Sequence, residues 1–226
     1  MSTYAEPNFV DPLTGVFAYA AWNSDPRRRG PFVRPSLTRR SKILEINDLA
    51  AALQQHRSVT GVRVFEATVM LPIPKLPHYD IVMLVHADTF EAAAAIADDP
   101  RLKEAHPATL FLATNAARFG TTDNGDRKAN ILLNHFTGTA QRAAAVSTWR
   151  DISAWFADKT GIDNSTLLQT EESAPYLLVN CARLPGGVVS FMLNQILRPS
   201  FHQFVRGLLK RNGLTSLPLF VRPVSP

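Results

Sequence analysis

The spacing of apolar residues divides the first half of the chain into predicted strands and helices. Residues 15–22 combine aromatic and small apolar side chains, as a buried strand does. Within residues 43–57, Ile46, Leu49 and Leu53 recur at helical spacing and predict an amphipathic helix. The pattern therefore begins with a strand that is followed by a helix.

Two strands, a second helix and a closing strand are predicted next. Apolar side chains are frequent at residues 62–71, 79–87 and 110–118, where we expect the strands. The helix is expected at residues 90–97, with Asp88 as its capping residue. The first half thus has the order βαββαβ.

The second half of the chain repeats this order. The elements predicted there are a strand at 130–138, a helix that includes 146–156, strands at 165–171 and 176–183, a helical region at 188–211 broken or kinked at Pro199, and a strand at 217–224. Such an internal repeat defines the expected domains. They are an N-terminal arm at 1–14, a first repeat at 15–119, a linker at 120–129 and a second repeat at 130–226.

The order of elements in each repeat predicts a four-stranded antiparallel sheet with two helices on one face. The other face of each sheet also carries apolar residues and needs a partner, and the sheet of the other repeat is the nearest one. We therefore expect an α+β fold in which two βαββαβ repeats pack their sheets face to face as a pseudo-twofold α/β barrel.

Four short segments strengthen this expectation through a family resemblance. Residues 79–86 (YDIVMLVH), 115–119 (NAARF), 134–136 (NHF) and 160–165 (TGIDNS) resemble an uncharacterised tandem family within the dimeric α/β-barrel superfamily of ferredoxin-like domains. That superfamily includes muconolactone isomerase-like, antibiotic-monooxygenase-like, EthD-like, stress-responsive and chlorite dismutase-like proteins. The resemblance implies the fold, but so many activities share this fold that it selects no reaction.

Composition is that of a globular protein. Hydrophobic residues make up 46% of the chain and charged residues 19%. No apolar run reaches the roughly 18 residues of a membrane span, and residues 1–6 do not resemble a signal peptide. We therefore expect a cytoplasmic protein that does not interact with membranes. The single cysteine, Cys181, excludes an internal disulfide and is expected to be a buried core thiol.

Positive charge is concentrated in one segment. Residues 26–42 contain seven basic residues and no acidic one, and no acidic residue follows Glu172. Either this segment is a solvated loop, or its summed field recruits a phosphate-bearing or acidic partner. Phe32 is its only aromatic residue, which argues against nucleic-acid binding.

The resemblance implies that ligands bind inside the barrel, so inward-facing polar residues are candidates. In the strand at 176–183 we expect Leu177, Val179 and Cys181 to face the helices, which would turn Tyr176 and Asn180 towards the cavity. The strand at 79–87 has the matching position in its own repeat. This match would make His86 the positional equivalent of Asn180, with Asp80 on the same strand face as His86.

Asn134 and His135 are adjacent in the strand at 130–138, so only one of them can reach the barrel interior. We prefer His135, because an imidazole acts as an acid or base near neutral pH. The predicted catalytic residues are therefore His135 and His86, and the predicted ligand-binding residues are Asn180, Tyr176, Asp80 and Asn134. The alternative for each is a structural hydrogen-bonding role.

No metal site and no cofactor is predicted, because the chain lacks close pairs of metal-binding residues and nucleotide-binding motifs. The leading hypothesis is a protein that binds a small apolar or aromatic metabolite, as a cofactor-free enzyme with a histidine acid or base. A non-catalytic stress or interaction protein is one alternative. A haem enzyme of the chlorite dismutase-like type, with His135 or His202 on the iron, is another. For the oligomeric state, the sequence is compatible with a monomeric pseudo-dimeric barrel and with a homo-oligomer.

Overall fold

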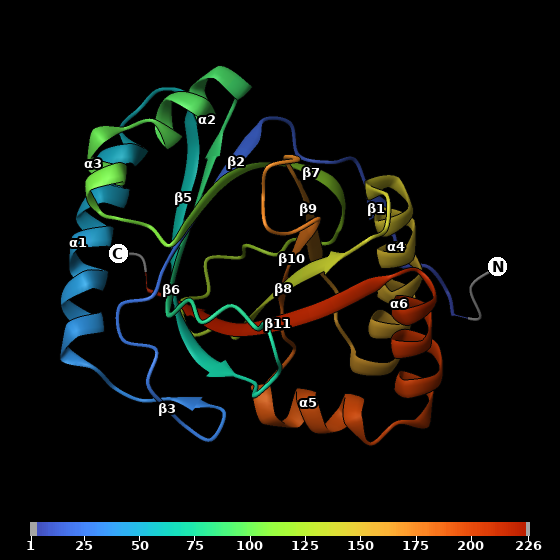
Figure 1. The fold of residues 1–226 in the computed structure, drawn as a ribbon. Coiled ribbons are helices and arrows are strands. Elements are labelled where there is room, and N and C mark those ends of the chain that lie inside the picture. The colour runs from blue at the N-terminus through green and yellow to red at the C-terminus, as the bar shows by residue number, and fades with distance from the viewer. Residues whose placement is uncertain (1–3, 225–226) are drawn as a thin grey trace.

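The structure, a computed structural model, describes residues 4–224 and consists of a barrel with helices on two sides (Figure 1). The first repeat contains β2 (Val16–Trp22), α1 (Leu37–Gln54), β5 (Val59–Met70), β6 (Ile81–Ala87), α2 (Phe90–Ala97), α3 (Pro100–Glu104) and β7 (Thr109–Phe119). The second contains β8 (Ile131–Gly138), α4 (Arg142–Thr160), β9 (Ser165–Thr170), β10 (Leu178–Arg183), α5 (Val188–Ile196), η1 (Phe201–Arg206), α6 (Gly207–Arg211) and β11 (Leu214–Pro223). Short strands β1 (Phe9–Val10), β3 (Arg28–Arg29) and β4 (Phe32–Val33) lie outside this pattern.

Within residues 4–224, eight antiparallel strands close into the barrel. The first sheet has the order β7-β2-β6-β5 and the second has the order β11-β8-β10-β9. The sheets join at both edges, where β7 pairs with β9 and β11 pairs with β5. Closure leaves these edges without unpaired backbone groups. The expected α+β pseudo-twofold barrel of two βαββαβ repeats is confirmed, and the structure adds that the sheets are joined edge to edge.

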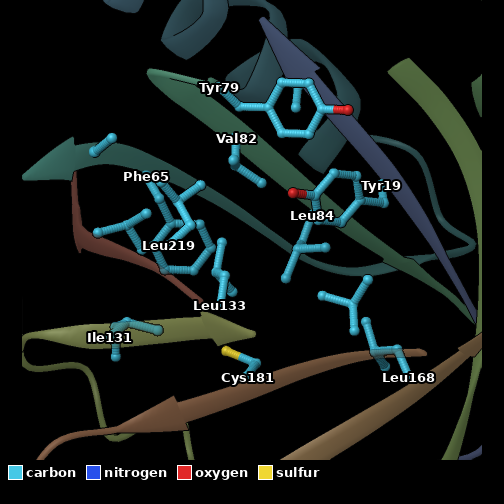
Figure 2. Close-up of a cluster of buried hydrophobic side chains, with 14 of the residues drawn as sticks. Tyr19, Phe65, Tyr79, Val82, Leu84, Ile131, Leu133, Leu168, Cys181 and Leu219 are labelled. Carbon is cyan, nitrogen blue, oxygen red and sulfur yellow. The ribbon is translucent and has the colours of Figure 1, made fainter. Parts of the chain in front are cut away.

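Three apolar cores follow from this arrangement. The first fills the barrel interior, where side chains from strands of both repeats meet, among them Tyr19, Phe65, Leu84 and Leu133 (Figure 2). The second lies between the first sheet and helices α1 to α3, and the third lies between the second sheet and helices α4 to α6. The barrel strands therefore have buried residues on both faces.

One expected helix start and one expected capping residue are corrected. α1 begins at Leu37 and not near residue 43, because the Ser36 hydroxyl accepts a hydrogen bond from the backbone N–H of Arg39 and caps the helix. Residues 37–42, the last third of the arginine-rich segment, are therefore helical. α2 spans the predicted residues, but its capping residue is Thr89 and not Asp88.

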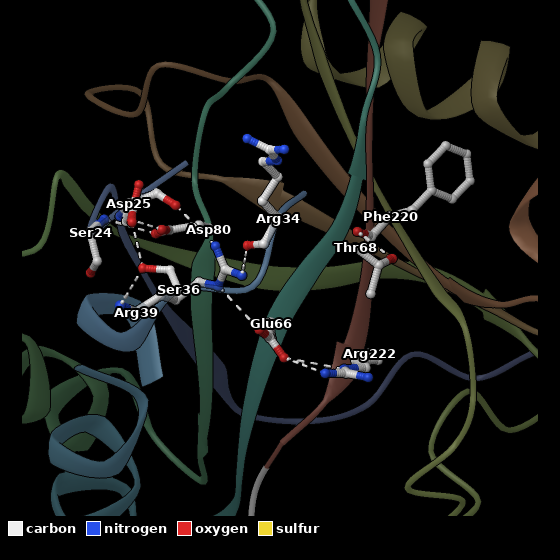
Figure 3. Close-up of polar contacts among 10 residues, drawn as sticks. All are labelled: Ser24, Asp25, Arg34, Ser36, Arg39, Glu66, Thr68, Asp80, Phe220 and Arg222. Atoms are coloured by element: carbon white, nitrogen blue, oxygen red, sulfur yellow. Dashed lines mark hydrogen bonds and ion pairs between the residues drawn. The ribbon is translucent and has the colours of Figure 1, made fainter. Parts of the chain in front are cut away.

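The arginine-rich segment is bound to the barrel by a polar network (Figure 3). The Arg39 side chain is only 3% exposed; it pairs with Glu66 at 3.1 Å and donates to the carbonyl oxygens of Asp25 and Arg34. Arg28 donates to the carbonyl of Met70 at 3.1 Å. These arginines hold the segment in place, so the interpretation of residues 26–42 as a freely solvated loop is wrong for Arg28 and Arg39.

None of the helices in residues 4–224 combines the length and apolar character needed to cross a membrane.

Candidate ligand-binding site

The barrel interior contains a cluster of three tyrosines around His135. The ring of His135 lies 4.6 Å from the ring of Tyr176, and the hydroxyls of Tyr79 and Tyr176 are 2.9 Å apart. The His135 Nδ1–H donates to the carbonyl of Leu217 at 3.3 Å, so its Nε2 accepts from the Tyr19 hydroxyl at 2.8 Å. Strand register therefore turns His135 inward, and Asn134 faces the helices.

His135 is completely buried and uncharged at neutral pH. Burial lowers the pKa of its imidazole from 6.5 to about 4, against a smaller opposing effect from the Leu217 carbonyl. Burial also raises the pKa of Tyr19 and of Tyr176. Both ring nitrogens of His135 have partners inside the barrel, so the cluster is a closed hydrogen-bonded group in this structure.

His86 lies on the same strand face as Leu84, at one end of the barrel. Its ring stacks on Phe17 with centroids 4.2 Å apart. Its Nε2–H donates to the carbonyl of Thr14 and its Nδ1 accepts from the Thr60 hydroxyl, each at 2.7 Å. His86 thus closes part of the barrel rim, and both of its nitrogens are engaged.

The facing expected for the strand at 176–183 is corrected. Val179 and Cys181 belong to the interior core, whereas Leu178 belongs to the core under the helices of the second repeat. Asn180 has the same facing as Leu178, away from the barrel interior, and its Oδ1 accepts from the Ser165 hydroxyl at 2.6 Å. Tyr176 does reach the interior core, as expected.

Asn180 and Asn134 are direct cross-strand neighbours in the register of β10 and β8. Both line a small cavity of about 30 Å³ between the second sheet and α4. The structure therefore brings these two predicted residues together, on the outer face of the sheet.

Asp80 is also not in a cavity, contrary to expectation. Its carboxylate accepts the backbone N–H groups of Ser24 at 2.8 Å and Asp25 at 2.5 Å, in the turn after β2 (Figure 3). Burial raises the pKa of Asp80, and these two hydrogen bonds oppose that rise. Asp80 fixes the turn that leads into the arginine-rich segment.

A groove of about 820 Å³ lies on the outer face of the second sheet, below the helices α5, η1 and α6. Leu132 and Asn134 of β8 and Ser216, Pro218 and Phe220 of β11 line its floor. Its wall is formed by Met192, Ile196, Phe201, His202, Val205, Arg206, Leu209 and Lys210. Most of this surface is apolar, with polar groups at a few points, which is typical of ligand sites.

The composition of the helices explains why the groove forms on this side. The alanine-rich α2 packs closely on the first sheet through Ala93 and Ile96, which are buried there. On the second sheet, α5 carries the bulky Phe191 and Met192, and the chain then enters the π-helix η1. A π-helical segment is rare and is frequently found at functional sites. The bulky side chains and the π-helix of this wall thus coincide with the groove.

The polar groups of the groove suit an anion. Asn134 accepts from the Ser216 hydroxyl through Oδ1 at 2.8 Å, and its Nδ2 has no hydrogen-bond partner among residues 4–224. His202, Arg206 and Lys210 are basic, and none of the described residues that line the groove is acidic. The groove therefore combines an apolar interior with an available amide donor and positive charge.

Arg198, His202 and Arg206 are spaced four residues apart in the sequence, as on one basic face of a helix. The structure places His202 and Arg206 at the groove, whereas Arg198 donates to the Asn194 side chain at 2.9 Å. The groove itself was missed. The signals for it were the Pro199 break and the absence of acidic residues after Glu172.

The two histidines considered for haem do not fit as iron ligands. Both nitrogens of His135 are engaged inside the barrel. The Nε2–H of His202 donates to the carbonyl of Ile196 at 2.8 Å, and its Nδ1 faces Arg206 Nη1 at 3.4 Å. Neither presents a free nitrogen to an axial position. Among the described residues there is also no cluster of three or more His, Cys, Asp or Glu side chains that could hold a metal ion.

Comparison with known proteins identifies the fold. No protein-family model and no curated protein sequence matches the chain. Among solved structures, an anthrone oxidase-like protein is similar with a TM-score of 0.61 at 10% sequence identity, over 94% of this chain and 92% of the other. A proposed monooxygenase of Fusobacterium nucleatum gives a TM-score of 0.57 at 7% identity, over 94% of both chains.

Chlorite dismutase of Candidatus Nitrospira defluvii is similar with a TM-score of 0.52 at 13% identity, over 93% of this chain and 92% of the other. These similarities extend over almost the whole length of the chain, so they include both repeats and the way they join. At such low identities they establish the fold and no activity. The chain therefore has the fold of the dimeric α/β-barrel proteins, with its two ferredoxin-like units joined in one polypeptide.

Proposed function

We propose that the protein binds a small apolar or aromatic molecule with an acidic group in the groove of the second repeat. The observation that carries this proposal is the groove of about 820 Å³, in which apolar side chains surround the free amide nitrogen of Asn134 and the basic groups of Arg206 and Lys210. An aromatic body would lie on Phe201 and Phe220, and its carboxylate would pair with the cations.

The name of one structural neighbour, an anthrone oxidase-like protein, agrees with an aromatic ligand. The proposal covers binding and leaves out acid or base catalysis by His135 or His86. A general acid or base must come within hydrogen-bonding reach of its substrate. In this structure both nitrogens of each ring bond to the protein itself.

Replacing Arg206 and Lys210 together with alanine is expected to weaken the binding of 2-naphthoate about tenfold or more, which corresponds to at least about 1.4 kcal/mol. The charged partners of the carboxylate are lost, while the apolar lining remains. Isothermal titration calorimetry measures the affinity. Neutral 2-naphthamide should bind the parent protein and this variant about equally.

Two further variants make this test specific to the groove. Arg211→Ala removes a neighbouring exposed cation of α6 that does not line the groove, and it should leave the affinity unchanged. Ser216→Phe puts a ring into the groove from β11 and should abolish binding. Equal affinity for 2-naphthoate in the parent, the double variant and Ser216→Phe would rule out the groove as the site.

A further inference from the structure

The barrel interior is not filled to both of its ends. At the end where His86 lies, a pocket of about 350 Å³ enters the barrel. Its deep part is lined by Phe17, Leu84, Leu168 and Cys181, which all belong to the interior core. This barrel-mouth pocket is separate from the groove of the second repeat, because it opens inside the barrel and shares no lining residue with the groove.

Charge at the mouth of the pocket is unbalanced. Arg63 pairs with Asp123 at 3.2 Å, and its guanidinium lies 4.8 Å from the centre of the Phe65 ring. Arg118 donates through Nε to the carbonyl of Asp11 at 2.7 Å. Within residues 4–224, Arg118 has no carboxylate within ion-pair distance. One positive charge at the mouth is therefore not neutralised by the protein.

Most of the other polar side chains at the mouth are already hydrogen-bonded or ion-paired. Both nitrogens of His86 are hydrogen-bonded, and the hydroxyls of Thr122 and Thr166 lie 3.0 Å apart as partners of each other. Besides the partly committed Arg118, the remaining polar side chains of the described lining are those of Gln54 and Thr121, and both are uncharged. A ligand that fits needs a single anionic group and an apolar remainder.

The size of the pocket limits that remainder. A volume of about 350 Å³ is near the lower end of the range of roughly 300–1,000 Å³ seen for small-molecule sites. A medium-length aliphatic chain can enter between Phe17, Leu84 and Leu168, and burial of its methylene groups would drive binding. A planar guanidinium binds a carboxylate through two parallel hydrogen bonds. Arg118 uses its Nε for the carbonyl of Asp11, which leaves Nη1 and Nη2 as its donors for a carboxylate.

We propose that the barrel mouth is a second ligand site, which binds a medium-chain monocarboxylate with its carboxylate on Arg118 and its aliphatic chain inside the barrel. The site is independent of the groove. The β-bulge of β5 between Val59 and Gly61 lies at this mouth, and a Cβ at Gly61 would meet no atom within 4 Å. The bulge and the glycine thus leave space where a regular strand would carry a side chain.

Isothermal titration of the full-length protein with sodium octanoate tests the proposal. Binding should be saturable, and Arg118→Gln should weaken it at least tenfold. The neutral analogue octanamide should bind the parent protein and Arg118→Gln about equally. Arg29→Gln, which replaces an exposed arginine outside the pocket, should bind octanoate like the parent protein.

Thr166→Phe provides the independent check, because Thr166 lines the pocket from β9 and is only partly buried, so that the added ring fills the mouth without entering the packed core. This variant should lose octanoate binding and keep the binding of 2-naphthoate in the groove. The proposal is overturned if octanoate does not saturate, if Thr166→Phe binds it like the parent protein, or if binding is lost instead in Ser216→Phe, which would place octanoate in the groove.

Discussion

Arg39→Ala is expected to lower the free energy of unfolding by about 3 kcal/mol, at the low end of the range for breaking a buried ion pair. The Arg39 side chain is 3% exposed and joins three separate parts of the chain. It pairs with Glu66 of β5 and donates to the carbonyls of Asp25 and Arg34 in the segment before α1. Alanine would leave both carbonyl oxygens without this donor and open a cavity in their place.

The expected loss of unfolding free energy stays at the low end of this range because Glu66 keeps a second cationic partner. Arg222 of β11 donates to Glu66 Oε2 at 2.8 Å, so the carboxylate would not be left unpaired (Figure 3). For a chain of this length, about 3 kcal/mol corresponds to a fall in Tm of roughly 10 °C. Urea unfolding followed by far-UV circular dichroism and a thermal scan measure the two quantities.

Arg40→Ala is the matched control. Arg40 is the next residue in α1 and is exposed, so its replacement should change the unfolding free energy by less than about 0.5 kcal/mol. Arg39→Lys keeps the charge but lacks the planar fork, and it should lie between alanine and the parent protein. If Arg39→Ala is as stable as Arg40→Ala, the network of Figure 3 does not hold the arginine-rich segment in place.

The order of elements was predictable because breaks in periodicity mark it. Glycine 161 ends α4 in a left-handed conformation, with φ of 75°, as its place after an apolar helix indicates. The start of α1 was missed for a local reason. Proline and arginine residues before residue 37 suggested a loop, although Pro35 directly precedes Ser36, whose hydroxyl caps the helix.

The facing of the barrel strands was not predictable, because both faces are buried. Residues 178–182 of β10 are all buried, so alternation between polar and apolar positions gives no contrast. A shift of one residue then exchanges the two faces. The barrel interior contains the thiol of Cys181, while on the other side the Oδ1 of Asn180 accepts a hydrogen bond from Ser165.

The groove depends on the distance between the helices and the sheet, and sequence periodicity does not indicate that distance. Helical spacing shows which face of a helix is apolar, and it does not show how far that face stands from the sheet. Phe201 and Val205 were assigned to a helical region broken or kinked at Pro199. They lie in the π-helix η1, which no sequence pattern indicates. The chemical candidates on this wall were therefore visible only as a basic helix face.

Lowering the pH from 6.5 towards 4 is expected to cost the protein roughly 3 kcal/mol of stability through His135 alone. Burial lowers the pKa of this imidazole to about 4, whereas in the unfolded chain it is near the ordinary value of 6.5. Between these values the unfolded state binds a proton that the folded state excludes. The stabilisation is therefore complete above pH 6.5 and is lost as the pH falls, at up to about 1.4 kcal/mol per pH unit.

A double variant isolates this contribution from that of the carboxylates. His135→Phe alone would leave the hydroxyl of Tyr19 without its partner, so Tyr19→Phe is combined with it and both polar groups are removed together. The double variant should show a flatter dependence of unfolding free energy on pH between 4.5 and 6.5, measured by urea unfolding at each pH. His56→Gln, at the exposed end of α1, should keep the parent slope. An unchanged slope in the double variant would mean that His135 takes up its proton without unfolding, and that the tyrosine cluster opens to water.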